Sequence, residues 1–363
     1  MTKRIYLDHA ATTPMRPEAV AAVAEGMARW ANPSSPHAEG RAARAALEDA
    51  RARIKAALGW EGEVILTSGA SEALAIGLGR AKAERRIVSA VEHDAVFRAA
   101  PAAAVLPMDG NGEADRDVLA ALLRDGTPAV VAIQHVNSEI GQHQPLDEIA
   151  PLVRAAGGLL LSDCAQSAGK EALPDADLIT VSAHKLGGPP GIGALLVRDL
   201  AMLDASGGQE FGYRGGTENL PGAMGFAAAA ECCRADMLDK FELMDVAEGL
   251  EEAIQNAGGV FVIGPPGGRI IRPSHHIAAF AMPGLPAAAQ LIRFDMAGFA
   301  VSAGSACASG SLKPSRALAA FGIPAEVAAR TIRVSYGWST TADDIHAFRE
   351  AWLRIAETAK ANA

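Results

Sequence analysis

The chain has 363 residues, half of them hydrophobic, and a formal net charge of −9 at pH 7. This length is enough to bury a large core and to form one large domain with a smaller one. The acidic balance argues against nucleic acid and against an anionic membrane surface as the main partner. The sequence has no run of about 18 uncharged apolar residues, so no membrane-spanning helix is expected.

The cysteine spacing bears on the cellular compartment. The four cysteines form no Cys-x-x-Cys pair and no disulfide framework: Cys164, Cys232, Cys233 and Cys307. The adjacent Cys232 and Cys233 cannot bridge each other without strain. The N-terminal MTKRIYLDHAATTP has two basic residues but no apolar run after them, so no signal peptide is predicted. We therefore expect a cytoplasmic protein with reduced thiols and no metal ligand set.

Strand and helix patterns alternate through the first half of the chain. Ile5–Asp8 is predicted to be a short strand, Pro17 begins a helix, and Ala38–Leu58 forms a long one. Asn32–His37 is a loop, because its prolines resist helix. Five more strands are predicted: Glu63–Leu66, Arg86–Ser89, Ala129–Ile133, Gly158–Ser162 and Asp177–Val181. The alternation predicts a largely parallel sheet wrapped by helices, with ligands beyond the C-terminal strand ends.

The second half predicts a smaller domain. Asn219 to about Ala257 forms one or two long helices that lead to it. The segments assigned to this domain are Val260–Ile263, Ile277–Met282, Val301–Gly310, Ile332–Tyr336 and a closing helix near Asp343–Ala361. We expect residues 14–255 to form the large domain, and residues 1–13 and 256–363 to form the small one.

One lysine stands just beyond a predicted strand end. The apolar run Leu178–Val181 is followed by Ser182, Ala183, His184 and Lys185, and then by a loop rich in glycine and proline. Such a loop adopts backbone shapes that other residues resist. We hypothesise that Lys185 forms a Schiff base with an aldehyde cofactor.

Residues at other strand ends supply the groups that pyridoxal phosphate requires. Asp163 can keep the pyridine nitrogen protonated, Gln166 can reach the phenolic oxygen, and His93 can lie flat on the ring. Taken singly, each has an ordinary role as a turn residue or a solvated charge. Their joint occurrence at strand ends favours a cofactor site.

The phosphate of such a cofactor needs hydrogen-bond donors. The segment Thr67–Ser71, which includes Ala70 and Ser71, turns from a predicted strand into a helix, and its N–H groups and hydroxyls suit an anion. Ser182 and His184 can add further donors.

Ten collinear segments resemble the cysteine desulfurases, which are class-V aminotransferase-like enzymes of pyridoxal-phosphate fold type I. They are YLDHAATTP (6–14), NPSSPH (32–37), TSGASE (67–72), EHDAV (92–96), HVNSEIG (135–141), DCAQSAGK (163–170), SAHKLGGPPGIG (182–193), RGGTEN (214–219), SAGSACASG (302–310) and IRVSYG (332–337). The resemblance implies a large domain with a mostly parallel seven-stranded sheet, a smaller α+β domain that carries a catalytic cysteine, and a homodimer. It also implies the cofactor roles given above, and that Thr217 reaches the phosphate of the partner subunit's cofactor.

The same resemblance implies the chemistry of Cys307. A free cysteine is usually a small buried hydrophobe, but here the family match implies a nucleophile that takes sulfur from L-cysteine, releases L-alanine and carries a persulfide. The loop resembles that of the desulfurases with longer loops, which favours transfer to an acceptor such as an iron–sulfur scaffold. Arg333 is expected to hold the substrate carboxylate as a bidentate fork, with Asn32 and Asn137 assisting.

Four residues depart from the family pattern: Ser138 and Ala75, where asparagines are usual, Phe211 in place of an arginine, and Cys164 in place of an alanine. They leave the substrate preference and the sulfur acceptor open. The alternatives are a selenocysteine lyase, another class-V aminotransferase or lyase, and a protein that binds a partner without catalysis.

Overall fold

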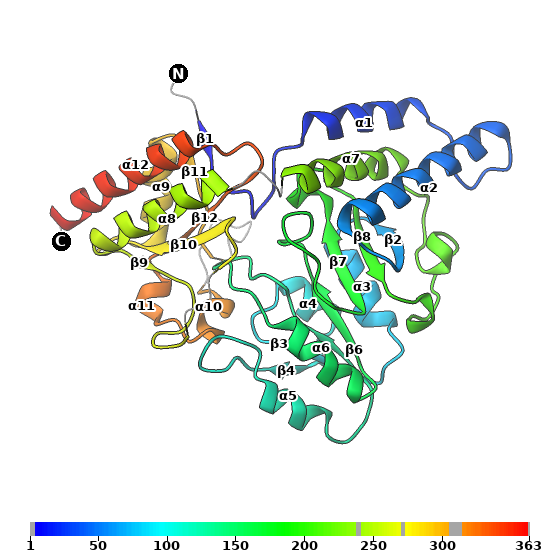
Figure 1. Cartoon of the computed structure of the whole chain (residues 1–363), viewed down its shortest axis with the longest axis horizontal. Coiled ribbons are helices and arrows are strands. Elements are labelled where there is room, and N and C mark those ends of the chain that lie inside the picture. The colour runs from blue at the N-terminus through cyan, green and yellow to red at the C-terminus, as the bar shows by residue number, and fades with distance from the viewer. Residues whose placement is uncertain (1–3, 237–240, 270–272, 305–313, 362–363) are drawn as a thin grey trace.

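The computed structural model describes residues 4–236, 241–269, 273–304 and 314–361. The chain forms a larger body around a seven-stranded sheet and a smaller body around a three-stranded sheet (Figure 1). Cys307 lies outside the described residues. No helix in the described part of the chain is long and apolar enough to span a bilayer.

The large sheet has the strand order β2-β8-β7-β6-β5-β3-β4. Its strands are β2 (Glu63–Thr67), β3 (Arg85–Ser89), β4 (Ala104–Leu106), β5 (Ala129–Ala132), β6 (Leu159–Asp163), β7 (Leu178–Ser182) and β8 (Gly193–Val197). Only β8 runs against its neighbours, β2 and β7. The predicted seven-stranded, mostly parallel sheet is therefore confirmed, although β4 and β8 are not among the individually predicted strands.

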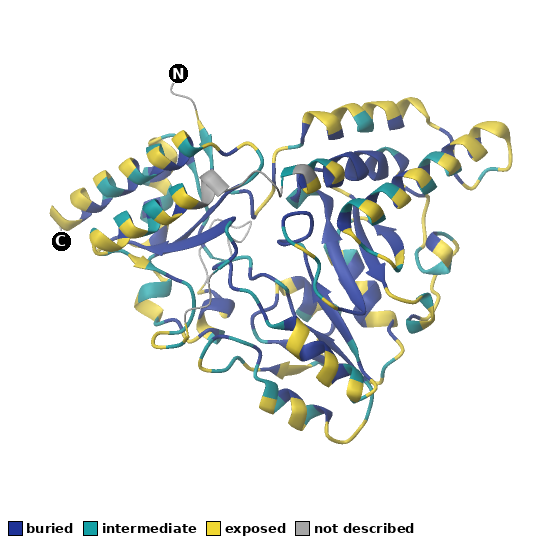
Figure 2. Ribbon diagram, viewed as in Figure 1, coloured by how far each residue is buried: buried dark blue, intermediate teal, exposed yellow. Residues whose placement is uncertain are grey.

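Helices cover both faces of this sheet. Helices α2 (Ala38–Leu58), α5 (Arg116–Leu123), α6 (Leu146–Ala155) and α7 (Leu220–Asp236) supply buried residues to one core, and α3 (Ala70–Arg80) and α4 (Asp94–Ala99) to another. Helix α1 (Pro17–Ala28) packs outside, along α7. The central strands are buried almost throughout, whereas the edge strand β4 and the outer helix faces are exposed (Figure 2). This layering leaves the strand ends as the place where polar side chains can gather.

Small residues let α7 approach its neighbours closely. A Cβ on Gly225 would lie 2.6 Å from Val23 Cγ2 and 3.0 Å from Pro189 Cγ. The second of these contacts belongs to the loop that follows Lys185. Gly225 thus allows α1, α7 and that loop to pack without a gap.

The smaller body has its own apolar core. The sheet β12-β10-β9 (Thr331–Ser335, Ile277–Ala281 and Val260–Phe261) is antiparallel, and helices α8 (Phe241–Asn256), α9 (Ala287–Met296) and α12 (Ala342–Ala361) pack with it. Short helices α10 (Arg316–Ala320) and α11 (Ala325–Ala328) lie beside it. Trp352, Phe280, Phe294 and Phe348 are fully buried there.

The N-terminal arm belongs to this smaller body. Strand β1 (Ile5–Tyr6) pairs with β11 (Phe299–Ala300), and Leu7 lies in the smaller core. Leu250 and Ile254 of α8 lie in the same core. We propose that the small domain comprises residues 1–13 and the chain from α8 onward, so that α8 belongs to it rather than to the large domain.

A buried ion pair fixes α2 against the segment that leads to Thr217. Arg51 makes two hydrogen bonds to Glu210, of 2.6 and 3.0 Å, and Leu66 N donates to the same carboxylate. The guanidinium also lies 4.8 Å from the centre of the Phe211 ring. Glu210 and Phe211 both have positive φ values, of 49° and 59°. The ion pair therefore holds a backbone conformation that non-glycine residues rarely adopt.

We expect Glu210→Gln to destabilise the protein strongly, because it removes the fully buried carboxylate of the pair and leaves Arg51 with the partly exposed Glu48, 3.0 Å from its Nε, as its remaining anionic partner. The side chains of Arg51 and Glu210 are 7% and 0% exposed, and breaking such a pair costs about 3–5 kcal/mol. The pair Arg53–Glu231 is a matched control two residues along the same helix, because its side chains are 36% and 45% exposed. Glu231→Gln should cost no more than about 1 kcal/mol. Urea unfolding followed by circular dichroism measures both, and equal losses would contradict the burial argument.

Candidate active site

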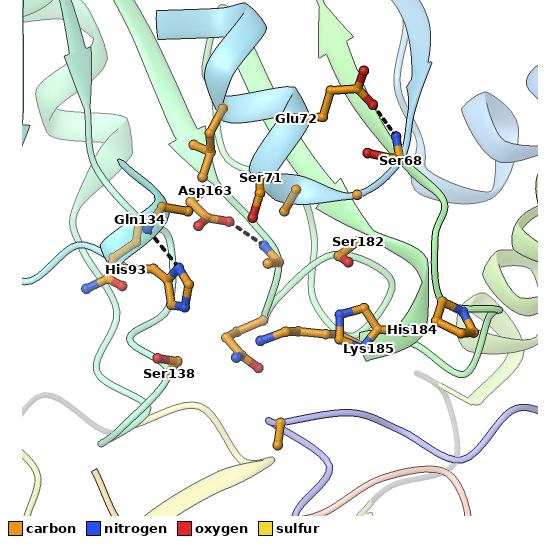
Figure 3. Close-up of a pocket in the computed structure, with 18 of the residues that line it drawn as sticks. Ser68, Ser71, Glu72, His93, Gln134, Ser138, Asp163, Ser182, His184 and Lys185 are labelled. Atoms are coloured by element: carbon orange, nitrogen blue, oxygen red, sulfur yellow. Dashed lines mark hydrogen bonds between the residues drawn. The ribbon is translucent and has the colours of Figure 1, made fainter. Parts of the chain in front are cut away.

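The predicted cofactor residues converge on one cavity of about 450 Å³, beyond the C-terminal ends of the parallel strands (Figure 3). Its lining includes Ser68, Gly69, Ala70, Ser71, His93, Gln134, Ser138, Asp163, Gln166, Ser182, His184 and Lys185. These residues come from the ends of β2, β3, β5, β6 and β7. A cavity of this size lies within the usual range for small-molecule sites.

Lys185 ends the short helical turn that follows β7, and its amine points into the cavity (Figure 3). Its Nζ donates to the carbonyl of Ala10, at 3.0 Å. Burial, followed by the charge of Arg333, lowers the pKa of Lys185 to about 8, against the opposing effect of Asp163 and Asp8. About a tenth of the amine is therefore unprotonated at pH 7, far more than for an ordinary lysine, and only this form acts as a nucleophile.

Asp163 and Gln166 lie on the β6 side of the cavity. Thr180 Oγ1 and the Ala165 amide donate to Asp163 Oδ1, at 3.1 and 2.9 Å. These two contacts orient the carboxylate and leave Oδ2 for a ring nitrogen. Gln166 Nε2 donates to the Ala10 carbonyl at 3.0 Å, while its Oε1 is buried without a partner among the described residues. The second N–H of this amide remains for a phenolic oxygen.

His93 caps α4 and lines the cavity beside Lys185. Its Nδ1 accepts from the Ala95 amide at 3.2 Å, which directs Nε2 away from the helix. Burial lowers the pKa of His93, Lys185 lowers it further, and Asp163 acts in the opposite direction. The imidazole is therefore held largely neutral, a state that suits contact with an aromatic ring.

The opposite end of the cavity is built for an anion. Helix α3 begins just after Gly69, and its first N–H groups have no carbonyl within the helix to bind. Ser71 and Ser182 line the same end. His184 is held by Thr12 Oγ1, at 3.0 Å from Nδ1, and burial lowers its pKa, followed by the charge of Lys185. Hydroxyls and helix N–H groups form a suitable donor set for a phosphate.

A second cavity, of about 470 Å³, adjoins the first and shares Lys185, His93 and Ser138 with it. Arg333 lies on its wall, where Nη1 donates to the Ser138 carbonyl at 2.8 Å and Nη2 to Asp8 Oδ1 at 2.7 Å. Its Nε is buried without a partner among the described residues. A small carboxylate ligand can therefore meet both a cation and the reactive amine.

Asn137 also lines the second cavity, whereas Asn32 and Thr217 lie outside both cavities. Asn32 is exposed and accepts from the Ser34 amide, outside both cavities. Thr217 is exposed on the loop before α7 and lines neither cavity in this chain. Cys307 cannot be assigned a position, because it lies outside the described residues.

Three functional neighbours were not predicted: Asp8, Thr180 and Glu92. Asp8 lies in the quoted YLDHAATTP segment, but its partner Arg333 is 325 residues away. Thr180 faces Asp163 across neighbouring strands, a pairing that becomes evident only from the register of β6 and β7. Glu92 is buried beneath His93, where burial raises its pKa to about 8.

The structure also shows the surroundings of Cys164 and Ala75, two of the residues that depart from the family pattern. Cys164 is fully buried behind Asp163, and burial raises the pKa of its thiol to about 12, so it is a packing residue rather than a nucleophile. Ala75 is exposed on α3.

Known proteins resemble this chain over almost its whole length. A family model described as Aminotransferase class-V matches residues 5–348. A cysteine desulfurase IscS from Dictyoglomus turgidum is 34% identical over 382 residues, which cover 98% of this chain and 95% of that protein. A solved NifS-like protein from Rickettsia africae superposes with a TM-score of 0.86 at 28% identity, covering 98% of this chain and 99% of that one. A solved structure of SspA in complex with cysteine has a TM-score of 0.74 at 28% identity, covering 91% and 98%.

The lowered pKa of Lys185 predicts how its reactivity changes with pH. Only the unprotonated amine attacks an aldehyde, so trapping of a small aromatic aldehyde by a hydride reagent in cofactor-free protein should rise about tenfold per pH unit below pH 8 and level off above it. Mass spectrometry of the Lys185 peptide measures the rate. Arg333→Gln should move the bend to higher pH, because it removes a neighbouring cation. A rate that climbs without a bend to pH 10 would contradict the lowered pKa.

Proposed function

Because the chain belongs to the aminotransferase class-V family, we propose that it is a pyridoxal-phosphate-dependent L-cysteine desulfurase. It removes the sulfur of L-cysteine, releases L-alanine and keeps the sulfur as a persulfide on Cys307. The names of its relatives support this reaction, and the neighbour solved with cysteine supports the substrate.

The observation that carries the proposal is the convergence of Lys185, Asp163 and the start of α3 on one cavity. A buried amine of lowered pKa, a carboxylate held on one oxygen, and an anion-binding helix start match the aldehyde, ring nitrogen and phosphate of pyridoxal phosphate. When bound, this cofactor supplies an aldehyde that condenses with amines and a ring that takes up electrons.

Each residue then has a definite task. Asp163 Oδ2 holds a proton on the ring nitrogen, and His93 covers one face of the ring. Arg333 binds the substrate carboxylate after that carboxylate displaces Asp8 from the guanidinium. Lys185 Nζ takes the α-proton, which its pKa of about 8 allows near neutral pH. Asn137 borders the substrate beside Arg333, and Asn32 is retained only as a more distant assistant.

The thiol completes the balance of the reaction. The Cys307 thiolate attacks the substrate sulfur, the bond between that sulfur and the β-carbon breaks, and the β-carbon takes up a proton to give alanine. The new S–S bond leaves a persulfide on Cys307, and no external oxidant is needed. Because attack requires the thiolate, the rate should fall at pH values below the pKa of this thiol.

The partners follow from the same proposal. The persulfide passes to an acceptor protein such as an iron–sulfur scaffold. The active unit is a homodimer, in which Thr217 binds the phosphate of the cofactor in the partner subunit. Its exposure outside both cavities of its own chain supports that assignment. A cytoplasmic location remains a prediction from the cysteine usage.

A selenocysteine lyase is the main alternative, because a selenide leaves without help from a thiol.

We expect the wild type to release sulfide and alanine in equal amounts from L-cysteine with a reductant. Cys307→Ser should lose at least about 100-fold in rate, because it removes the nucleophile. Cys232→Ser is the control, since this half-exposed thiol on α7 lies outside both cavities and should leave the rate unchanged.

The outcomes separate the two reactions. A mass increase of one sulfur on Cys307 after cysteine treatment supports the desulfurase. Selenide release that survives Cys307→Ser, with no sulfide from cysteine in either protein, would identify the lyase instead.

A further inference from the structure

A cluster of histidines and one carboxylate lies beside the catalytic segment but outside the machinery described above. His135 follows β5, His143 lies on the return strand of the same turn, and Glu171 lies in the connection from β6 to β7. One ligand atom from each of the three residues lies within 4.8 Å of the other two. Two imidazoles and a carboxylate at this separation form a donor set that suits Zn²⁺.

Backbone hydrogen bonds bring these side chains together. The Gln144 amide donates to the His135 carbonyl and the Asn137 amide to the Gln142 carbonyl, at 3.0 and 2.9 Å, so residues 135–144 form a hairpin-like turn. The rings of His135 and His143 meet edge to face, with their centres 5.5 Å apart. His143 Nε2 lies 2.6 Å from Glu171 Oε2. Ligand atoms around a tetrahedral cation with bonds of about 2.1 Å lie about 3.4 Å apart, so on binding the contact between His143 and Glu171 would have to widen.

Two of the three candidate ligands, His135 and Glu171, also make a hydrogen bond outside the cluster. His135 Nδ1 lies 2.9 Å from Ser167 Oγ, which fixes the ring and leaves Nε2 as the nitrogen available for a cation. Glu171 uses its second oxygen, Oε1, to accept from Ser274 Oγ. Such outer hydrogen bonds fix the tautomer of a ligating histidine and the direction of a ligating carboxylate.

The cluster can be reached from solvent. A cavity of about 420 Å³ is lined by His135 and Glu171 together with Asp147 and Glu148. Glu148 is paired with Arg116, so Asp147 is the acidic side chain of the entrance that is left to attract cations. The open space leaves room for water as the fourth ligand.

A second grouping, Glu171 with His275 and His276, is less suited to a cation. Both ring nitrogens of His276 already have partners, since Nδ1 lies 2.6 Å from Ser274 Oγ and Nε2 lies 2.9 Å from the Gln166 carbonyl. Its role is to support Glu171 through Ser274, while the metal-binding face of Glu171 points toward His143.

We propose that His135, His143 and Glu171 form a Zn²⁺ site that is separate from the catalytic cavities. A cation there ties the turn after β5 to the segment after β6. That segment carries Asp163 and Gln166, and the His135 amide donates to the Asp163 carbonyl at 3.0 Å. The site is thus placed to stiffen one wall of the cofactor cavity without contacting the cofactor.

The test is titration of chelator-treated holoenzyme with Zn²⁺ by calorimetry, and with Co²⁺ by visible spectroscopy. The wild type should bind one equivalent and show the absorption of tetrahedral Co²⁺, outside the cofactor band. His143→Ala and Glu171→Gln should lose this binding, whereas Ser274→Ala should weaken it by about 10-fold. His346→Ala, an exposed histidine on α12, is the control and should bind as the wild type does.

Thermal unfolding provides a second readout, because bound Zn²⁺ stabilises the folded state. Zn²⁺ should raise the Tm of the wild type and of His346→Ala but not that of His143→Ala. Retention of the cofactor absorbance by each variant excludes misfolding as the cause. The proposal is overturned if the wild type binds no Zn²⁺, if His143→Ala and Glu171→Gln bind it as tightly, or if Cys307→Ser abolishes the binding, which would place the cation on the thiol.

Discussion

The carbonyl of Ala10 is the point on which the site depends. Lys185 Nζ and Gln166 Nε2 both donate to it, at 3.0 Å each. The Ala10 amide in turn donates to Ser335 Oγ, at 2.9 Å. One residue of the N-terminal arm therefore joins the amine and the ring-binding amide of the large body to strand β12 of the small body.

The rest of the arm repeats this connection. Thr13 holds the arm against the turn that carries the catalytic lysine. Its amide donates to the His184 carbonyl and its hydroxyl to the Lys185 carbonyl. Asp8 pairs with Arg333. The arm thereby places a carboxylate beside the guanidinium and near the lysine, so the charge balance around Lys185 depends on how the two bodies sit against each other. The pKa of Lys185 is therefore coupled to the packing of the small body against the large one.

Local patterns account for most of what could be predicted. The helix over residues 38–58 has the expected bounds, and the strands before Asp163 and Lys185 were placed within one residue, because apolar runs and glycine-rich turns are short-range signals. The resemblance to the desulfurase family implies a mostly parallel seven-stranded sheet, and the structure confirms it. Strand β8 is not predicted, because its apolar residues follow directly on the glycine-rich loop and the turn signals of that loop favour an irregular segment.

What could not be predicted depends on pairing between distant segments. Thr180 reaches Asp163 only through strand register, and Asp8 reaches Arg333 only after the small body has formed. The His135, His143 and Glu171 cluster is equally invisible in sequence, because its members are spaced like no metal motif and meet across two separate turns. The strained Glu210–Phe211 backbone depends on Arg51, from another helix.

The parallel pairing of β1 with β11 also sets an order in time. A chain is made from its N-terminus, and domains fold as units while synthesis proceeds. The large sheet can close once β8 has emerged, but the arm cannot dock until Phe299 and then Arg333 exist. Lys185, made near the midpoint of the chain, must therefore wait for almost the last strand before its carbonyl partner is held in place. The first residues translated are among the last to reach their native positions, so the wall that Ala11 adds to the cofactor cavity is completed only in the finished polypeptide.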